Sequence, residues 1–246
     1  MKIQTCTFTG VDEDTNLETI AAISTVCPQA EWGFLYSPTL QGTNMRYPSV
    51  NFIRKAINTL PITVKIALHI CGKGVIELMN NGLIASELTS GISNRGGRIQ
   101  LNFNAEQSTI MAARLQEIFR EYTYISRPSE NPLFIIQHNA ANDALATYLI
   151  EANAEFGILF DSSGGQGKSP SSWPEAIQNK YCGYAGGLSP DMINTQLNKI
   201  KAVNTDRETK IWIDMESHIR SAFNYGNSFF DINKCANVLN SIRDHL

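Results

Sequence analysis

A carboxylate followed by a glycine-rich turn is the part of this chain best suited to chemistry. Phe156–Phe160 is an apolar run typical of a buried strand, and Asp161 follows it directly. A carboxylate there is placed to give or take a proton, or else to accept hydrogen bonds from the turn. Gly164 and Gly165 permit positive φ, so their N–H groups can line an anionic group. Ser162 stands where a Walker motif needs glycine, which excludes that type of nucleoside triphosphate site.

A second glycine turn follows the next strand-like run. Gly186 and Gly187 end that run, and Ser189 with Pro190 predicts the N-cap and first position of a helix. Free N–H groups at a helix start favour an anion such as phosphate. The alternative is a tight strand-to-helix turn without a ligand. Together the two glycine turns predict a site for a phosphorylated sugar.

Strand-like and helix-like runs alternate along the chain. The strand-like runs are Ile3–Phe8, Trp32–Tyr36, Ile62–Ile70, Arg98–Phe103, Leu133–Gln137, Phe156–Phe160, Tyr181–Ala185 and Ile211–Met215. The helical runs are Asn16–Val26, Ser49–Leu60, Gly74–Met79 continuing through Ala85–Ile92, Glu106–Tyr122, Asp143–Ala154, Trp173–Asn179, Met192–Val203 and Asp231–Leu246. This alternation, uninterrupted by a linker, predicts an α/β fold, one (β/α)8 TIM barrel forming a single domain over residues 1–246. A doubly wound open sheet is the alternative.

Polar residues at the strand ends are the candidates for function, because active sites of TIM barrels lie where strands end. They include Thr9, Ser37, His69, Asn102, Gln137, His138, Asp161, Asp214, Glu216, Ser217 and His218. A divalent-metal aldolase, epimerase or hydrolase is one candidate function, since histidine and carboxylate bind zinc or manganese. Its ligands would come from His69, His138, Asp161, Glu216 and His218. These residues lack a recognised metal spacing, so we predict no metal site.

Composition limits the partners. Hydrophobic content of 43% with 17% charged residues describes a soluble globular protein with a sizeable core. A net charge of −3 gives no general attraction to nucleic acid or anionic lipid, so we expect neither as a partner. The chain shows neither a signal peptide nor a membrane span, and we expect a cytoplasmic protein. The five cysteines lack Cys-x-x-Cys spacing, and the oligomeric state stays open.

Several segments occur in the order of one family's motifs. They are Trp32–Pro38, Arg46–Ser49, Ile99–Leu101, Leu159–Asp161 with its glycine turn, and Ala185–Pro190. This order resembles the phosphoribosylanthranilate isomerases of tryptophan biosynthesis. The similarity spans nearly the whole chain, and the last two segments match best. It implies a TIM barrel and a cofactor-free isomerase, an intramolecular oxidoreductase that interconverts an aldose and a ketose.

The resemblance also implies roles for single residues. The family's reaction is an Amadori rearrangement, which turns a phosphorylated aminoaldose into an aminoketose. By resemblance, Asp161 is the acid that opens the furanose ring, and Arg46 pairs with the anthranilate carboxylate, a partner that suits the guanidinium fork. A solvated loop charge is the alternative for Arg46. The residues expected to bind substrate are Arg46, Gly164, Gly165, Gly186, Gly187 and Ser217.

Three positions depart from the family's pattern, and one of them is His69, which stands where an apolar residue is common. The family's base is a Cys followed by Gly at the end of the first strand, where this chain has Thr9; Thr9, or Cys6 if the strand is shifted, occupies the base position. After the last strand, Glu216 brings a negative charge to the place of the phosphate. The sequence therefore admits a changed substrate, with His69 or Glu216 as base. It also admits a non-catalytic protein that binds a phosphate ligand and has lost the base.

Overall fold

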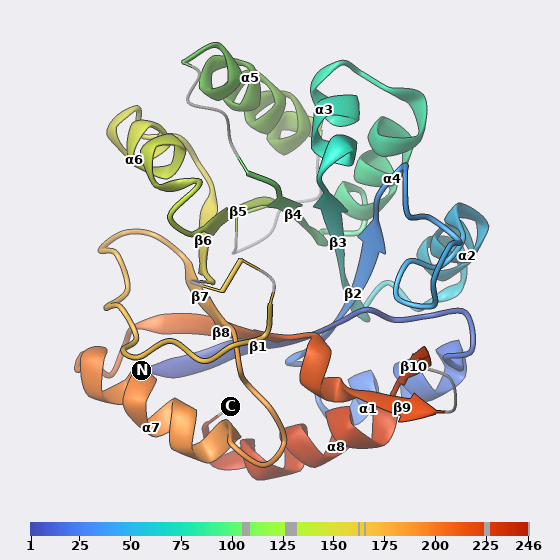
Figure 1. Cartoon of the computed structure of the whole chain (residues 1–246), viewed down its shortest axis with the longest axis vertical. Coiled ribbons are helices and arrows are strands. Elements are labelled where there is room, and N and C mark those ends of the chain that lie inside the picture. Colours follow the sequence, from blue (N-terminus) through green and yellow to red (C-terminus); the bar gives the residue numbers. More distant parts are fainter. Residues whose placement is uncertain (105–108, 126–131, 162, 165, 224–226, 246) are drawn as a thin grey trace.

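Eight parallel strands form a closed barrel in the computed structural model, which describes residues 1–104, 109–125, 132–161, 163–164, 166–223 and 227–245 (Figure 1). The strands are β1 Lys2–Thr9, β2 Ala30–Tyr36, β3 Lys65–Cys71, β4 Arg98–Asn102, β5 Phe134–His138, β6 Gly157–Phe160, β7 Cys182–Ala185 and β8 Lys210–Met215. They pair in chain order, and β1 also pairs with β8. This closure confirms the TIM barrel, and the open doubly wound sheet is wrong.

Helices surround the barrel (Figure 1). They are α1 Leu17–Val26, α2 Val50–Thr59, α3 Lys73–Met79, α4 Leu83–Ser93, α5 Thr109–Ile125, α6 Asp143–Glu151, α7 Ile193–Val203 and α8 Ile232–Ser241. Local sequence sets their starts: the Asn16 side chain accepts hydrogen bonds from the N–H groups of Glu18 and Thr19 at the start of α1. Within the described ranges no helix is long and apolar enough to cross a membrane. The cytoplasmic location stays a prediction.

The predicted helix Trp173–Asn179 is wrong, because the segment has no regular structure. Pro174 lacks an N–H group for a helical hydrogen bond. Tertiary contacts hold the segment instead: the Trp173 indole donates to Gln196 at 3.0 Å, and the Tyr184 hydroxyl donates to the Pro174 carbonyl at 3.0 Å. Helix-like spacing is therefore overridden by the burial of Trp173.

The predicted helix start at Ser189 and Pro190 is also wrong. Ser189 does accept a hydrogen bond from the N–H group of Met192 at 3.2 Å, as an N-cap residue would. That bond closes a turn, however, and α7 begins only at Ile193. The N–H groups at the start of α7 are therefore displaced along the chain from the glycine turn. The predicted helix start at Glu106 lies outside the described residues.

A two-stranded hairpin after β8 was missed by the sequence analysis. Its antiparallel strands are β9 Arg220–Phe223 and β10 Asn227–Phe230, which follow a short 3-10 helix over Ser217–Ile219. The hairpin is anchored by Phe230, whose ring lies 6.2 Å from that of Trp32. Arg220 forms a buried ion pair with Asp12 at 3.0 Å. These contacts fix the course of the chain directly after β8, where the site begins.

The barrel interior combines an apolar cluster with several polar and charged side chains, whereas aliphatic side chains dominate this position in most TIM barrels. Near its amino-terminal end, Arg98 pairs with Glu31. The Arg98 guanidinium donates a hydrogen bond to the Thr7 hydroxyl, and that hydroxyl donates to Glu31. The guanidinium also lies 4.7 Å from the ring centroid of Trp212. Gly183 is required beside this ring, because a Cβ there would overlap it. The buried ion pair of Arg98 and Glu31 therefore lies beneath the residues near the mouth of the barrel.

Candidate active site

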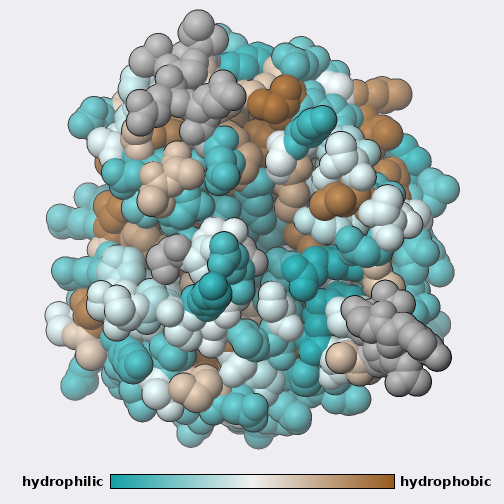
Figure 2. All heavy atoms as spheres, viewed as in Figure 1, coloured by the Kyte–Doolittle hydropathy of each residue, from teal (hydrophilic) through white to brown (hydrophobic). Residues whose placement is uncertain are grey.

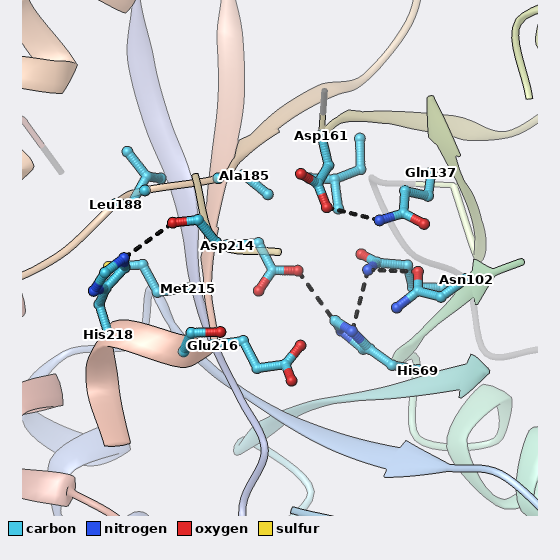
Figure 3. A pocket seen from close by; sticks show the side chains of 16 residues that line it. His69, Asn102, Gln137, Asp161, Ala185, Leu188, Asp214, Met215, Glu216 and His218 are labelled. Carbon is cyan, nitrogen blue, oxygen red and sulfur yellow. Dashed lines mark hydrogen bonds and ion pairs between the residues drawn. The ribbon is translucent and has the colours of Figure 1, made fainter. Parts of the chain in front are cut away.

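A pocket opens at the carboxyl ends of the barrel strands, where active sites of this fold lie. Three carboxyl groups line it: Asp161 after β6, Asp214 in β8 and Glu216 just beyond β8. Figure 3 shows their side chains around the same space, with His69 beside Asp214. Figure 2 shows mainly hydrophilic residues around the centre of the face that it presents. The pocket therefore gathers groups that can exchange protons.

A hydrogen-bonded chain crosses the floor of the pocket. The Gln100 amide donates to Nδ1 of His69 at 3.1 Å and to Oδ1 of Asn102 at 2.9 Å. Because Nδ1 accepts, the His69 proton resides on Nε2, which lies 3.5 Å from Oγ1 of Thr9. The Thr9 hydroxyl donates to Oδ1 of Asp214 at 2.8 Å. Four strands, β1, β3, β4 and β8, thus position one carboxyl group.

Burial decides the protonation of this chain. It raises the pKa of Asp214 to about 8, although the Thr9 hydrogen bond opposes the shift and the negative charge of Glu216 adds to it. Burial also lowers the pKa of His69 to about 3. Asp214 is therefore a neutral acid and His69 a neutral imidazole at pH 7, so their 3.8 Å contact is not an ion pair there. His69 is poorly suited to be the base considered from the sequence.

Asp161 is also buried, but it accepts hydrogen bonds from two residues. Oδ2 accepts a hydrogen bond from the Gln137 amide at 2.7 Å. Oδ1 accepts from the N–H group of Ser163 at 3.1 Å and from its hydroxyl at 2.7 Å. Asp161 thus accepts hydrogen bonds from the turn and lines the pocket as well, so both sequence-based interpretations describe its geometry. Its oxygens are held as acceptors.

Glu216 is paired with Arg46. Their side chains form a 2.9 Å ion pair in which the two are 26% and 34% exposed. Burial raises the pKa of Glu216, and the charges of Arg46 and Arg220 oppose that shift. Arg46 is therefore neither a solvated loop charge nor an unoccupied clamp for a substrate carboxylate. Its predicted pairing with the anthranilate carboxylate would compete with Glu216.

The glycines predicted to bind substrate have different surroundings. Gly186 and Gly187 line the pocket with φ of 104° and 65°, a region that favours glycine. Ser217 lines the pocket as well. Gly164 also has a positive φ of 60° but is not among the residues that line this pocket. Gly165 lies outside the described residues.

Cys6 does not face the pocket, and its assignment to the base position is wrong. Successive side chains of a strand point to opposite faces, and Thr7 and Thr9 of β1 point into the barrel. Cys6 therefore points outward, where it packs in the buried apolar cluster that contains Cys235 of α8. Burial raises the pKa of the Cys6 thiol well above its ordinary value. Thr9 does lie at the site, where its hydroxyl donates a hydrogen bond to Asp214.

Gln100 is a site residue that the sequence analysis did not single out. Its signal was the alternation Arg98, Gln100, Asn102 in an otherwise apolar strand, which predicts one polar face. The alternation did not show that this polar face points into the barrel, because polar interiors are uncommon in this fold. The network around His69 follows from this strand.

His69, Asp161, Glu216 and His218 line the same pocket, but the candidate metal ligands do not group around one metal position. His138 bonds Asp143 at 2.9 Å, and Nε2 of His218 lies 3.0 Å from the Gly167 carbonyl oxygen. His69 is held within the barrel by Gln100. In the described part of the chain, no three or more His, Cys, Asp or Glu side chains group so that they could hold a metal ion. The arrangement gives the metal-enzyme alternative no support.

Comparison with solved structures places the fold. No protein-family model matches the chain, and no curated protein matches it. Phosphoribosylanthranilate isomerase from Thermotoga maritima is 18% identical over 98% of both chains, with a TM-score of 0.54. The enzyme from Thermus thermophilus is 15% identical over 98% of both chains, with a TM-score of 0.56. TrpF from Jonesia denitrificans is 15% identical over 98% of this chain and 97% of its own, with a TM-score of 0.57. The resemblance seen in the sequence is thus confirmed as a shared fold.

Proposed function

We propose that this protein is a cofactor-free isomerase that converts an aminoaldose into an aminoketose by acid–base catalysis. The observation that carries the proposal is the contrast between two carboxyl groups of one pocket: burial raises the pKa of Asp214 to about 8, and Asp161 accepts hydrogen bonds from Gln137 and Ser163. Pairs of carboxyl groups with such different surroundings supply the acid and the base in many enzymes. The fold shared with phosphoribosylanthranilate isomerases supports the reaction class.

The proposed reaction needs one proton donor and one acceptor. Asp214 gives its proton to the ring oxygen of the aminoaldose, the C1–O bond breaks, and the nitrogen lone pair forms a C1=N iminium cation. Asp161 then removes the proton from C2, and the released electron pair forms an enolamine that tautomerises to the ketose. The resemblance implies the acid role for Asp161, but the hydrogen bonds that it accepts from Gln137 and Ser163 favour the acceptor role.

The charge of the pocket suits the cationic intermediate. Asp161 and Glu216 line the space in which the iminium would form. Carboxylates fixed in advance around a developing positive charge stabilise it without reorganisation. Gly186, Gly187 and Ser217 line the same pocket, and we expect them to hold the far end of the sugar, where the resemblance places phosphate.

Turnover in deuterium oxide tests this function. The substrates are phosphoribosylanthranilate and N-ribosylaniline, each freshly prepared, and NMR follows loss of the C2 proton and appearance of deuterium at C1 of the ketose. We expect Asp214→Asn and Asp161→Asn each to lower kcat/KM by about 10²-fold or more. Asp191→Asn, at an exposed position after the glycine turn, is the matched control.

Two results would count against the proposal. Retention of turnover in both folded site variants would remove the assigned acid and base. Absence of turnover with either substrate, from wild-type protein with native circular dichroism, would favour the non-catalytic binding protein.

A further inference from the structure

We infer that the sugar taken by this site carries no phosphate, because Glu216 lines the pocket together with the glycine turn and engages Arg46, the cation expected to bind a substrate anion. This inference rests on the proposed function for its account of the sugar. It identifies the substrate class as a neutral N-substituted aminosugar whose far end presents hydroxyl groups.

The position of Glu216 is the first support. Glu216 lines the same pocket as Gly186, Gly187 and Ser217, the residues expected at the far end of the sugar. Its ion pair with Arg46 favours the carboxylate form and opposes the burial that raises the pKa of Glu216. A phosphate group bound beside it would bring like charges together in a partly buried space, where they are weakly screened.

The cations near the site are engaged elsewhere. Among the described residues that line the pocket, none is lysine or arginine. Arg46 is paired with Glu216, and Arg220 is paired with Asp12 and the Gly10 carbonyl oxygen. Lys168 is exposed, and its backbone carbonyl, rather than its ammonium group, lies against Gly186. The site therefore offers a phosphate no cation to offset Glu216.

The glycine turn packs on one side against Lys168 and Ser169. Gly187 packs directly against Ser169, whose hydroxyl lies 3.4 Å from the Gly187 carbonyl oxygen. The helix whose N–H groups would complete a phosphate site begins only at Ile193. The turn therefore has a backbone conformation that suits an anion, but it lacks the adjacent helix N-terminus that would strengthen anion binding.

A polyol fits the groups that remain. Glu216 and Asp161 can accept hydrogen bonds from sugar hydroxyls, and the Ser217 hydroxyl can donate or accept. At the nitrogen end, Arg46 is already neutralised by Glu216, so the aglycone needs no carboxylate. The pairing of Glu216 with Arg46 therefore disfavours an anionic group near this part of the pocket.

Calorimetric titration with two stable probes tests the inference. The probes are 1-anilino-1-deoxy-D-ribitol and its 5-phosphate, which differ only at the far end. We expect the wild-type protein to bind the neutral probe at least about tenfold more tightly. Glu216→Gln should move this ratio toward the phosphate probe by at least about tenfold, because it removes the repelling charge and frees Arg46. Glu121→Gln, at an exposed position on α5, is the control and should leave the ratio unchanged.

The outcomes separate this inference from the proposed function. Equal or tighter binding of the phosphate probe by the wild type, no measurable binding of the neutral probe, or an unchanged ratio in Glu216→Gln would each overturn it. Because the probes cannot react, preference for the neutral probe would uphold the substrate class even if the deuterium experiment refuted the isomerase.

Discussion

The protonation of Asp214 depends on the hydroxyl group of Thr9, and Thr9→Val tests this dependence. The hydroxyl donates to Oδ1 of Asp214 at 2.8 Å, and valine has nearly the same shape but cannot donate. The bond stabilises the ionised form of Asp214, so its loss must raise the pKa further. The shift therefore adds to the effect of burial, which already raises the pKa to about 8.

The size of the shift follows from the hydrogen bond. A hydrogen bond to a charged group contributes about 1.5 to 3 kcal/mol. One pKa unit corresponds to about 1.4 kcal/mol, so the pKa of Asp214 should rise by about one to two units. If Asp214 is the catalytic acid, activity falls as pH rises through its pKa. Thr9→Val should then move that loss of activity to higher pH by the same amount.

The pKa can be measured without a substrate. Carbon-13 NMR of protein labelled at the aspartate carboxyl carbons gives the titration, and Asp214→Asn assigns the resonance. Thr5→Val is the matched control, because Thr5 is a buried threonine of β1 farther from the pocket. Titration of Asp214 near its ordinary value of 3.8 in the wild type, or a downward shift in Thr9→Val, would refute the reasoning.

Three further substitutions test the barrel beneath the site. Arg98→Met leaves the buried Glu31 without its partner and should lower the free energy of unfolding by about 3 to 5 kcal/mol in urea titrations; a loss below about 1 kcal/mol would contradict the pairing. Gly183→Ala forces the Trp212 ring to move and should cost about 1 to 3 kcal/mol, seen as a lower Tm in calorimetry; an unchanged Tm would show that the ring has room. Cys6→Ala should leave kcat/KM within about twofold, because the thiol lies outside the barrel; a loss of about 10²-fold would restore Cys6 as the base.

The strands were predictable because buried parallel strands are continuous apolar runs, as Phe156–Phe160 illustrates. The segment Trp173–Asn179 was not, since its helical spacing is outweighed by contacts with Gln196 and Tyr184, which are distant in sequence. The hairpin β9–β10 was missed for a related reason. Its strands are four residues each and take their stability from contacts with Trp32 and Asp12.

The position of a site residue could be predicted where it directly follows a strand that is recognisable in the sequence. Asp161 and the turn at Gly186 follow apolar strands directly, and both lie at the pocket. The partners of Asp214 could not be found in this way, because they depend on how four strands are staggered around the barrel. Cys6 was misplaced because a one-residue change along a strand moves a side chain to the other face.

The polar residues inside this barrel connect the candidate site to residues that stabilise the fold. In most TIM barrels the loops carry the function while an apolar lower barrel carries stability, so the two can change separately. Here Asp214 is set by residues of β1, β3 and β4, and these rest on the buried pair of Arg98 and Glu31. Transfer of the loops alone to another barrel would therefore not transfer Asp214, which lies in β8. A change of reaction would require substitutions inside the barrel as well as in the loops.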